Sequence, residues 1–146
     1  MQCKIVSDKN DILKCIKLGE GHYDEVEKRF TGLPYKPNIS LFLQLFENGL
    51  LHTVALYDGA KVEGYVMFVM SPSLFSTSVN AQEIGLYVSK KYRGSGWFKR
   101  MLATAEKELS TKGATSLLLA FKEGMQHELP EGFREAETFY IKSLEL

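Results

Sequence analysis

Residues 92–102 read YRGSGWFKRML, and this stretch decides the fold that we predict for the chain. Gly94 and Gly96 stand directly before a segment whose apolar residues have helical spacing. Ordering a glycine costs more backbone entropy than ordering any other residue, so a helix start built only for stability would not use two of them. We therefore expect a loop whose backbone lies close against something else.

The segments on either side of this loop predict a strand, a helix and a second strand. Residues 81–88 (AQEIGLYV) predict the first strand. Residues 96–112 carry an apolar stripe with helical periodicity and end before Gly113. Residues 115–121 (TSLLLAF) are continuously apolar, as in a parallel strand that is covered on both faces. This order predicts a βαβ unit with parallel strands and a right-handed crossover.

The other segments surround this unit in a single predicted domain, residues 1–146. Ser7 or Asp8 can cap a helix that runs from about residue 11 toward residue 28, and Asn38 can cap a second helix over residues 38–49. Short strands are predicted at residues 3–7, on both sides of the Asp58-Gly59 turn within residues 50–71, and at the end of residues 132–146. The predicted fold class is α/β: a twisted, mostly antiparallel sheet of about six or seven strands, with one parallel pair, flanked by helices.

Composition narrows the functional classes. The chain has 146 residues, of which 45% are hydrophobic and 25% charged, as in folded globular proteins. Lysine and arginine together number 18 and so do aspartate and glutamate, and this neutral balance argues against nucleic acid or an anionic membrane as a partner. The two cysteines, without a secretory signal or a long apolar run, predict reduced thiols in a cytoplasmic protein. No C-x-x-C motif or histidine cluster occurs, so we expect no metal site.

The loop before the predicted helix has the features of an anion site. Free N–H groups and the positive end of the helix dipole attract a phosphate, and Arg93 adds a fork-shaped charge. A hydrolase phosphate loop would need Gly-Lys-Ser/Thr, and a dinucleotide fingerprint would need glycine where Lys99 stands. A third pattern, Gln/Arg-x-x-Gly-x-Gly/Ala, is met by Arg93 and Gly96, with Phe98 at its last position. The alternative is a flexible turn without a ligand.

Residues 83–119, from EIGLYV to TSLLL, resemble motif A of the GNAT acetyltransferase superfamily. The resemblance implies a sheet that splays between the strands at 81–88 and 115–121, with acetyl-CoA in the splay. It implies that the pyrophosphate is held by the loop, and that the pantetheine arm pairs with the backbone near Tyr87 and Val88. The implied loop residues are Arg93, Gly94, Ser95, Gly96, Trp97 and Phe98. A narrower resemblance, to small acetyltransferases carried by bacteriophages, would place the protein in the host cytoplasm.

Two features depart from the family pattern. Phe98 replaces the small residue that usually ends the loop motif. The family also has a helix after the second central strand, with an Asn and a Tyr near the cofactor, but only residues 122–131 (KEGMQHELPE) separate Phe121 from Gly132. One helical turn fits there, so the usual acid Tyr has no obvious counterpart.

The resemblance implies an acetyl-CoA-dependent N-acyltransferase in which an amine attacks the thioester directly. The amine must first lose a proton, and the candidates for the base are Gln82, Glu83, His127 and Glu128. Glu83 is the only acid on the strand that enters the loop, so we predict it as the base, with Tyr140 as the acid for the leaving thiolate. The oxyanion would be met by backbone N–H groups near Val88.

Several alternatives stay open at this point. The shortened segment 122–131 would suit a GNAT-fold module that binds CoA or a partner without turnover, and an acyltransferase for a nucleobase or tRNA is a further reading. The amine acceptor, a small molecule or a protein, is unknown, and the chain could act as a homodimer. Trp97 either packs on the sheet edge or lines the cofactor or acceptor cleft. His22 and Tyr23 lie either at the acceptor entrance or simply on the surface.

Overall fold

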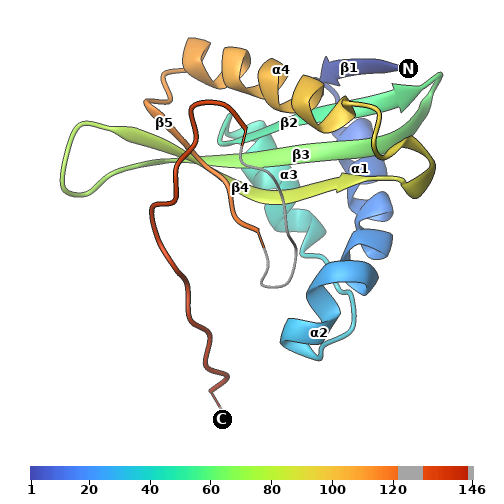
Figure 1. Cartoon of the computed structure of the whole chain (residues 1–146), viewed down its shortest axis with the longest axis horizontal. Helices are drawn as coiled ribbons and strands as arrows, with labels where there is room; N and C mark the ends of the chain where they lie inside the picture. The colour runs from blue at the N-terminus through green and yellow to red at the C-terminus, as the bar shows by residue number, and fades with distance from the viewer. Residues whose placement is uncertain (122–129, 145–146) are drawn as a thin grey trace.

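The computed structural model describes residues 1–121 and 130–144, and within them a five-stranded sheet has the order β1-β2-β3-β4-β5 (Figure 1). Strands β1 to β4 pair in antiparallel fashion, and β5 is parallel to β4. The strands are β1 (Gln2–Ile5), β2 (Leu51–Asp58), β3 (Lys61–Pro72), β4 (Val79–Val88) and β5 (Ser116–Leu118). The predicted fold class, a mostly antiparallel mixed sheet with one parallel pair, is confirmed.

The parallel pair is short, and this shapes the site. β4 and β5 pair only from Asn80↔Ser116 to Gln82↔Leu118, after which β5 ends and β4 continues to Val88. Beyond Gln82, β4 therefore has no strand partner on its outer edge among the described residues. On its inner edge, Phe68 pairs with Glu83 and Met67 with Gly85, so Ile84 is the extra residue of a β-bulge.

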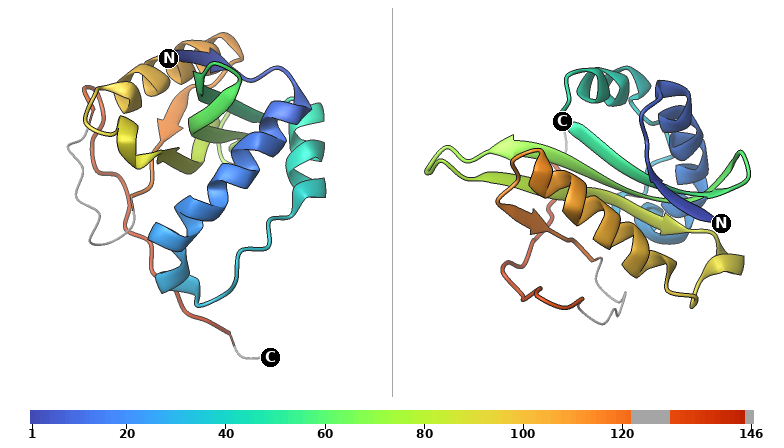
Figure 2. Two further views of the ribbon diagram at one scale, coloured as in Figure 1. Left: turned by 90° about the vertical axis from the view of Figure 1, so that its right-hand side faces the viewer. Right: turned by 90° about the horizontal axis from the view of Figure 1, so that it is seen from above.

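Helices cover both faces of the sheet (Figure 2). One face packs against α4 (Trp97–Thr111) through a buried cluster that includes Val66, Phe68 and Met101. The other face packs against α1 (Lys9–His22) and α3 (Ile39–Glu47) through a second cluster that includes Ile12 and Tyr65. The apolar stripes predicted from the sequence are thus the faces that the helices bury.

Local hydrogen bonds explain where the first helices begin. Asp8 caps α1 by accepting from the Asn10 N–H at 2.6 Å, and Asn38 caps α3 by accepting from the Leu41 N–H at 3.1 Å. The helix predicted to reach residue 28 changes form after α1. It continues as a π-helical turn, η1 (Tyr23–Glu27), and then as α2 (Lys28–Thr31). The short 3₁₀ turn η2 (Lys90–Tyr92) links β4 to the glycine loop.

The strand predicted at the end of the chain is wrong for the described residues. Residues 130–144 contain no strand and run away from the sheet (Figure 1), so the described residues form five strands instead of the six or seven that we predicted. Tyr140 is 92% exposed, and Phe139 and Ile141 are each 75% exposed. Aromatic and β-branched residues give a segment strand propensity, but a strand forms only where a neighbour completes its backbone hydrogen bonds.

The cysteines and the length of the helices can also be compared with the sequence predictions. Cys3 and Cys15 are free thiols, as predicted, and burial raises the pKa of the Cys15 thiol to about 12, which leaves it unreactive. None of the described helices is long and apolar enough to cross a membrane.

Candidate active site

A cleft of about 650 Å³ opens where β4 loses its strand partner. One wall is the glycine loop with the first turn of α4, and the opposite wall is the end of α1 with η1. The strand between them contributes residues 83–88, and residues 120–121 close one side. The predicted site residues that line this cleft are Glu83, Tyr87, Val88, Arg93, Gly94, Gly96, Trp97 and Phe98.

The glycine loop has the backbone that an anion site requires. Gly94 and Gly96 have φ values of 81° and 80°, a region that residues with a side chain rarely adopt. A Cβ atom added at either glycine would meet nothing within 4 Å, so the space in front of the loop is open. Gly96 is also the N-cap of α4 and provides no side-chain cap, which leaves the N–H groups of the first turn available to a ligand.

The positive charge near this loop is arranged in a way that the sequence did not predict. The Arg93 Nε donates to the carbonyl oxygen of Val88 at 2.6 Å, and its Nη2 donates to Glu25 Oε2 at 3.0 Å. The guanidinium also lies 5.2 Å from the centre of the Tyr87 ring. Arg93 therefore connects the glycine loop to the opposite wall of the cleft. Lys99 lines the cleft as well and carries the other positive charge of the loop wall.

Glu25 is the residue that sequence reasoning missed. Its Oε1 accepts a hydrogen bond from the Tyr87 hydroxyl at 3.0 Å, while Oε2 pairs with Arg93. Burial works to raise the pKa of Glu25, but hydrogen bonds from Arg93 and Tyr87 outweigh it and hold the pKa below its ordinary value. Glu25 is therefore a carboxylate at neutral pH. It precedes Arg93 by 68 residues, so only the fold brings them together.

Aromatic side chains complete this wall. The His22 ring stacks on the Tyr87 ring, with centroids 5.6 Å apart and planes inclined by 17°. His22 Nδ1 lies 2.9 Å from the Tyr65 hydroxyl, and burial raises the pKa of Tyr65 well above its ordinary value. His22 thus lies in the cleft, one of the two positions left open for it, whereas Tyr23 does not line it. The His22 and Tyr87 rings therefore offer flat, partly polar surfaces to a molecule that enters the cleft.

Glu83 lies in the floor of the cleft beside the β-bulge. It is only 9% exposed, yet it lines the cleft, and its charge contributes to the raised pKa of Tyr65. Of the other base candidates, Gln82 does not line the cleft, and His127 and Glu128 lie outside the described residues. Tyr140, the predicted acid, lies on the exposed tail and not among the cleft residues described here.

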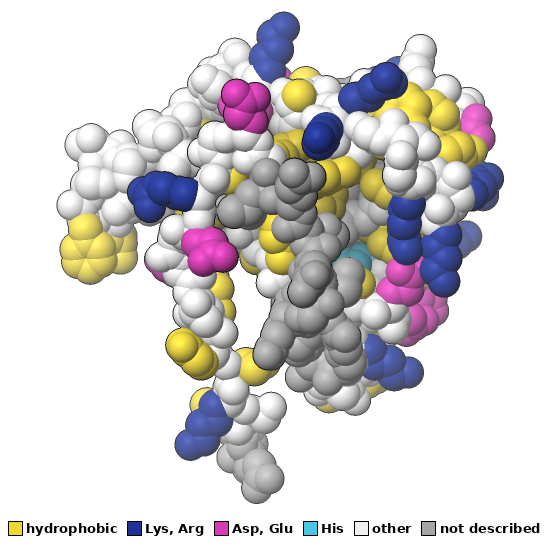
Figure 3. All heavy atoms as spheres, viewed as in Figure 1, with side chains coloured by type: hydrophobic (Ala, Val, Ile, Leu, Met, Phe, Trp, Pro, Cys, Tyr) yellow, Lys and Arg dark blue, Asp and Glu magenta, His cyan; other side chains and the backbone are white. Residues whose placement is uncertain are grey.

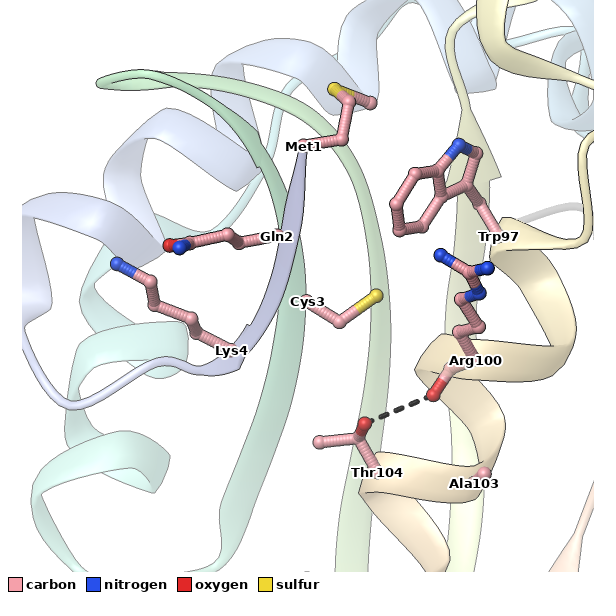
Figure 4. A pocket seen from close by; sticks show the side chains of 8 residues that line it. All are labelled: Met1, Gln2, Cys3, Lys4, Trp97, Arg100, Ala103 and Thr104. Carbon is pink, nitrogen blue, oxygen red and sulfur yellow. Dashed lines mark hydrogen bonds between the residues drawn. The ribbon is translucent and has the colours of Figure 1, made fainter.

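Trp97 combines the two positions that the sequence left open. It lines the cleft, and it also packs against the core cluster beneath α4. Figure 4 shows its ring facing a hollow between α4 and β1, where Met1 and Cys3 lie opposite, with the Arg100 guanidinium 4.6 Å from the ring centre. Ser95 stands within the loop but does not line the cleft.

The family of the chain follows from a comparison with family models. Residues 20–128 match the model of the acetyltransferase (GNAT) family. The matched residues include those that line both walls of the cleft. The chain belongs to the GNAT acetyltransferase family. A search of curated protein sequences found no match.

Solved structures show the same GNAT fold at low sequence identity. An aminoglycoside acetyltransferase from a soil metagenomic sample, in complex with trehalose, is 10% identical with a TM-score of 0.69, over 93% of this chain and 96% of that chain. A predicted acetyltransferase from Clostridium acetobutylicum, solved with acetyl-CoA, is 14% identical with a TM-score of 0.66, over 93% and 96%. The ribosomal-protein-alanine N-acetyltransferase of Brucella melitensis is 14% identical with a TM-score of 0.62, over 85% and 83%.

Proposed function

We propose that this GNAT protein is an acetyl-CoA-dependent N-acetyltransferase in which an amine attacks the thioester directly. The observation that supports it best is the outer edge of β4, which beyond Gln82 has no strand partner among the described residues, beside an uncapped glycine loop. An unpaired strand edge offers hydrogen bonds to an amide-containing arm, and the loop offers N–H groups to a pyrophosphate. The two features lie in one cleft.

The residues present fit such a cofactor. The backbone of Tyr87 and Val88 would hold the pantetheine arm, and the loop from Arg93 to Phe98 would hold the pyrophosphate. Phe98, the departure from the family motif, lies at the cleft with its ring partly buried against the core, so it does not fill the space before the glycines. Acetyl-CoA, when bound, supplies an acetyl group activated as a thioester.

Glu83 is the residue to which we assign proton removal from the amine. An alkylamine has a pKa of about 10.4, so little of it is neutral at physiological pH and a base beside it raises the reactive fraction. Glu83 is the one carboxylate of β4 and lies in the cleft floor. Backbone N–H groups of β4 near Val88 would stabilise the oxyanion, and Glu83, which lies further back along the same strand, would then take the proton through ordered water. Tyr140 as the acid stays a prediction.

Release of free thiol from acetyl-CoA, measured across a pool of amine acceptors, tests this proposal. We expect thiol release that depends on an amine and saturates with acetyl-CoA. A thermal shift with acetyl-CoA but no thiol release from any amine would identify instead a GNAT-fold module that binds the cofactor without turnover. The absence of both would remove the acetyltransferase proposal.

A further inference from the structure

The cleft already contains one bound cation, the guanidinium of Arg93. Glu25 accepts from it at 3.0 Å, and the ring of Tyr87 lies 5.2 Å below it. A carboxylate combined with an aromatic face is the arrangement that binds ammonium and guanidinium groups in proteins. The Tyr87 hydroxyl donates to the second oxygen of Glu25 at 3.0 Å and so fixes the direction of the carboxylate. We call Glu25 and Tyr87 the cation subsite.

Charge in the cleft is divided between its walls. The basic residues that line it, Arg93 and Lys99, belong to the loop and α4. The acidic residues, Glu25, Glu27 and Glu83, belong to η1 and β4. Figure 3 shows basic and acidic side chains next to each other where the loop meets the end of α1. A phosphate suits the first wall and a cation suits the second.

We infer that the cation subsite selects acceptors that carry a second positive group beside the amine that is acetylated. This inference rests on the proposed function, because it names the acceptor of that same cleft. Arg93 occupies the subsite in the ligand-free chain. A phosphate at the glycine loop offers Arg93 a second anionic partner, and Glu25 then becomes available to the acceptor. Cofactor and dicationic acceptor should therefore strengthen the binding of each other, since coupling between two sites is reciprocal.

A structural role for the Glu25–Arg93 pair is the competing explanation. If the pair serves only to hold the loop in place, Glu25→Gln should weaken CoA binding. If Glu25 is a subsite that Arg93 leaves, Glu25→Gln should bind CoA at least as well as the wild type does, because no ion pair has to break. Titration of CoA into both proteins by calorimetry, without any acceptor, separates these two roles.

The kinetic test compares α,ω-diamines of several chain lengths with monoamines of the same lengths. For the best diamine we expect kcat/KM to exceed that of its monoamine by about 10-fold or more, which is the effect of one charge-assisted hydrogen bond. Glu25→Gln should bring the ratio of diamine to monoamine close to one. Asp24→Asn is the matched control, because Asp24 is the exposed neighbour in η1, does not line the cleft, and should preserve the ratio.

A binding measurement completes the experiment, with the same diamine titrated into the protein with and without saturating CoA. We expect CoA to tighten diamine binding in the wild type and not in Glu25→Gln. Turnover that is equal for diamines and monoamines would overturn the inference and leave the proposed function standing. CoA-dependent diamine binding without any turnover would overturn the proposed function and leave the cation subsite standing. Loss of CoA binding in Glu25→Gln would show a structural pair and overturn the cation subsite.

Discussion

The two walls of the cleft are built in different ways. The loop wall is one continuous stretch, residues 93–99, and it offers mainly backbone N–H groups, which positive-φ glycines leave uncovered. The opposite wall consists of side chains from α1, η1 and β4, chiefly His22, Glu25 and Tyr87. A backbone site depends on local conformation, whereas a side-chain site depends on the packing of distant elements. The first wall suits a ligand common to a family, and the second suits selection among acceptors.

The largest expected effect is on the loop wall, with Gly96→Glu. The new side chain would project into the open space before the loop and repel a phosphate, so acetyl-CoA should no longer stabilise the protein. In the wild type we expect that stabilisation to be about 2.7 kcal/mol when the ligand is 100-fold above its Kd. The φ of 80° also adds backbone strain of about 1–2 kcal/mol, so the variant should melt cooperatively at a lower temperature.

Gly113→Glu is the control for this prediction. Gly113 has a φ of 98° at the other end of α4 and does not line the cleft, so the variant carries similar strain but should keep the full acetyl-CoA shift. Thermal melts with and without acetyl-CoA measure both variants. A full shift in Gly96→Glu would mean that the loop is only a turn.

The second effect concerns the floor between the walls. Glu83→Gln removes the carboxylate to which we assign proton removal, and kcat should fall by roughly 100-fold while CoA affinity stays nearly unchanged. Steady-state kinetics and CoA titration measure the two quantities. Glu106→Gln, an exposed position on α4, is the control. If kcat of Glu83→Gln matched the wild type from about pH 6 to about pH 9, another group would have to remove the proton.

The third effect tests the contact between the walls. Arg93→Ala removes one charged partner of a phosphate but leaves the backbone N–H groups, so the acetyl-CoA shift should shrink without vanishing. Arg93→Lys retains the charge and loses the fork that contacts Val88 and Glu25 together, and its shift should fall between those of Arg93→Ala and the wild type. A shift in Arg93→Ala equal to that of the wild type would show that Arg93 contacts only Glu25 and Tyr87 on the opposite wall and does not contribute to acetyl-CoA binding.

The fourth effect is the pH dependence of the acidic wall. The pKa of Glu25 is lower in the folded chain than its ordinary value of 4.5. The folded state therefore binds this proton less readily than the unfolded state, and the contribution of Glu25 to stability is present above pH 4.5 and lost as the pH falls through the folded pKa. Chemical unfolding at several pH values should show a smaller loss of stability on acidification in Glu25→Gln than in the wild type. Equal losses would mean that the ion pair adds nothing to folding.

The smallest effect is spectroscopic. Trp97 lines the cleft and is the only tryptophan, so its emission should change when CoA binds at the loop wall. A titration followed by fluorescence, with binding confirmed by calorimetry, measures this. An emission spectrum that does not change at saturating CoA would show that the Trp97 ring contacts mainly the hollow between α4 and β1 and not the bound CoA.

Most of the loop wall could be predicted from the sequence because its determinants are local. Glycine positions, the apolar stripe of α4 and the strands on either side follow from conformational preferences and periodicity within about forty residues. Glu25 could not be found in this way, since an acidic residue near a helix end usually faces solvent. The change from α-helix to π-helix at Tyr23 is equally invisible in the apolar pattern, yet it belongs to the segment that presents Glu25.

By itself, the sequence determined the α/β class and the parallel pair around the glycine loop, and it predicted an anion site in that loop. Tertiary structure decided that β5 stops at Leu118, so that beyond Gln82 β4 has no outer strand partner in the part of the chain that the structure describes. It also decided that residues 130–144 form no strand despite the apolar run at 139–141. It also decided that Arg93 reaches across the cleft to Glu25. The physical reason is that backbone preferences act between neighbours in the chain, whereas strand pairing and ion pairs depend on which distant segments the folded core brings together.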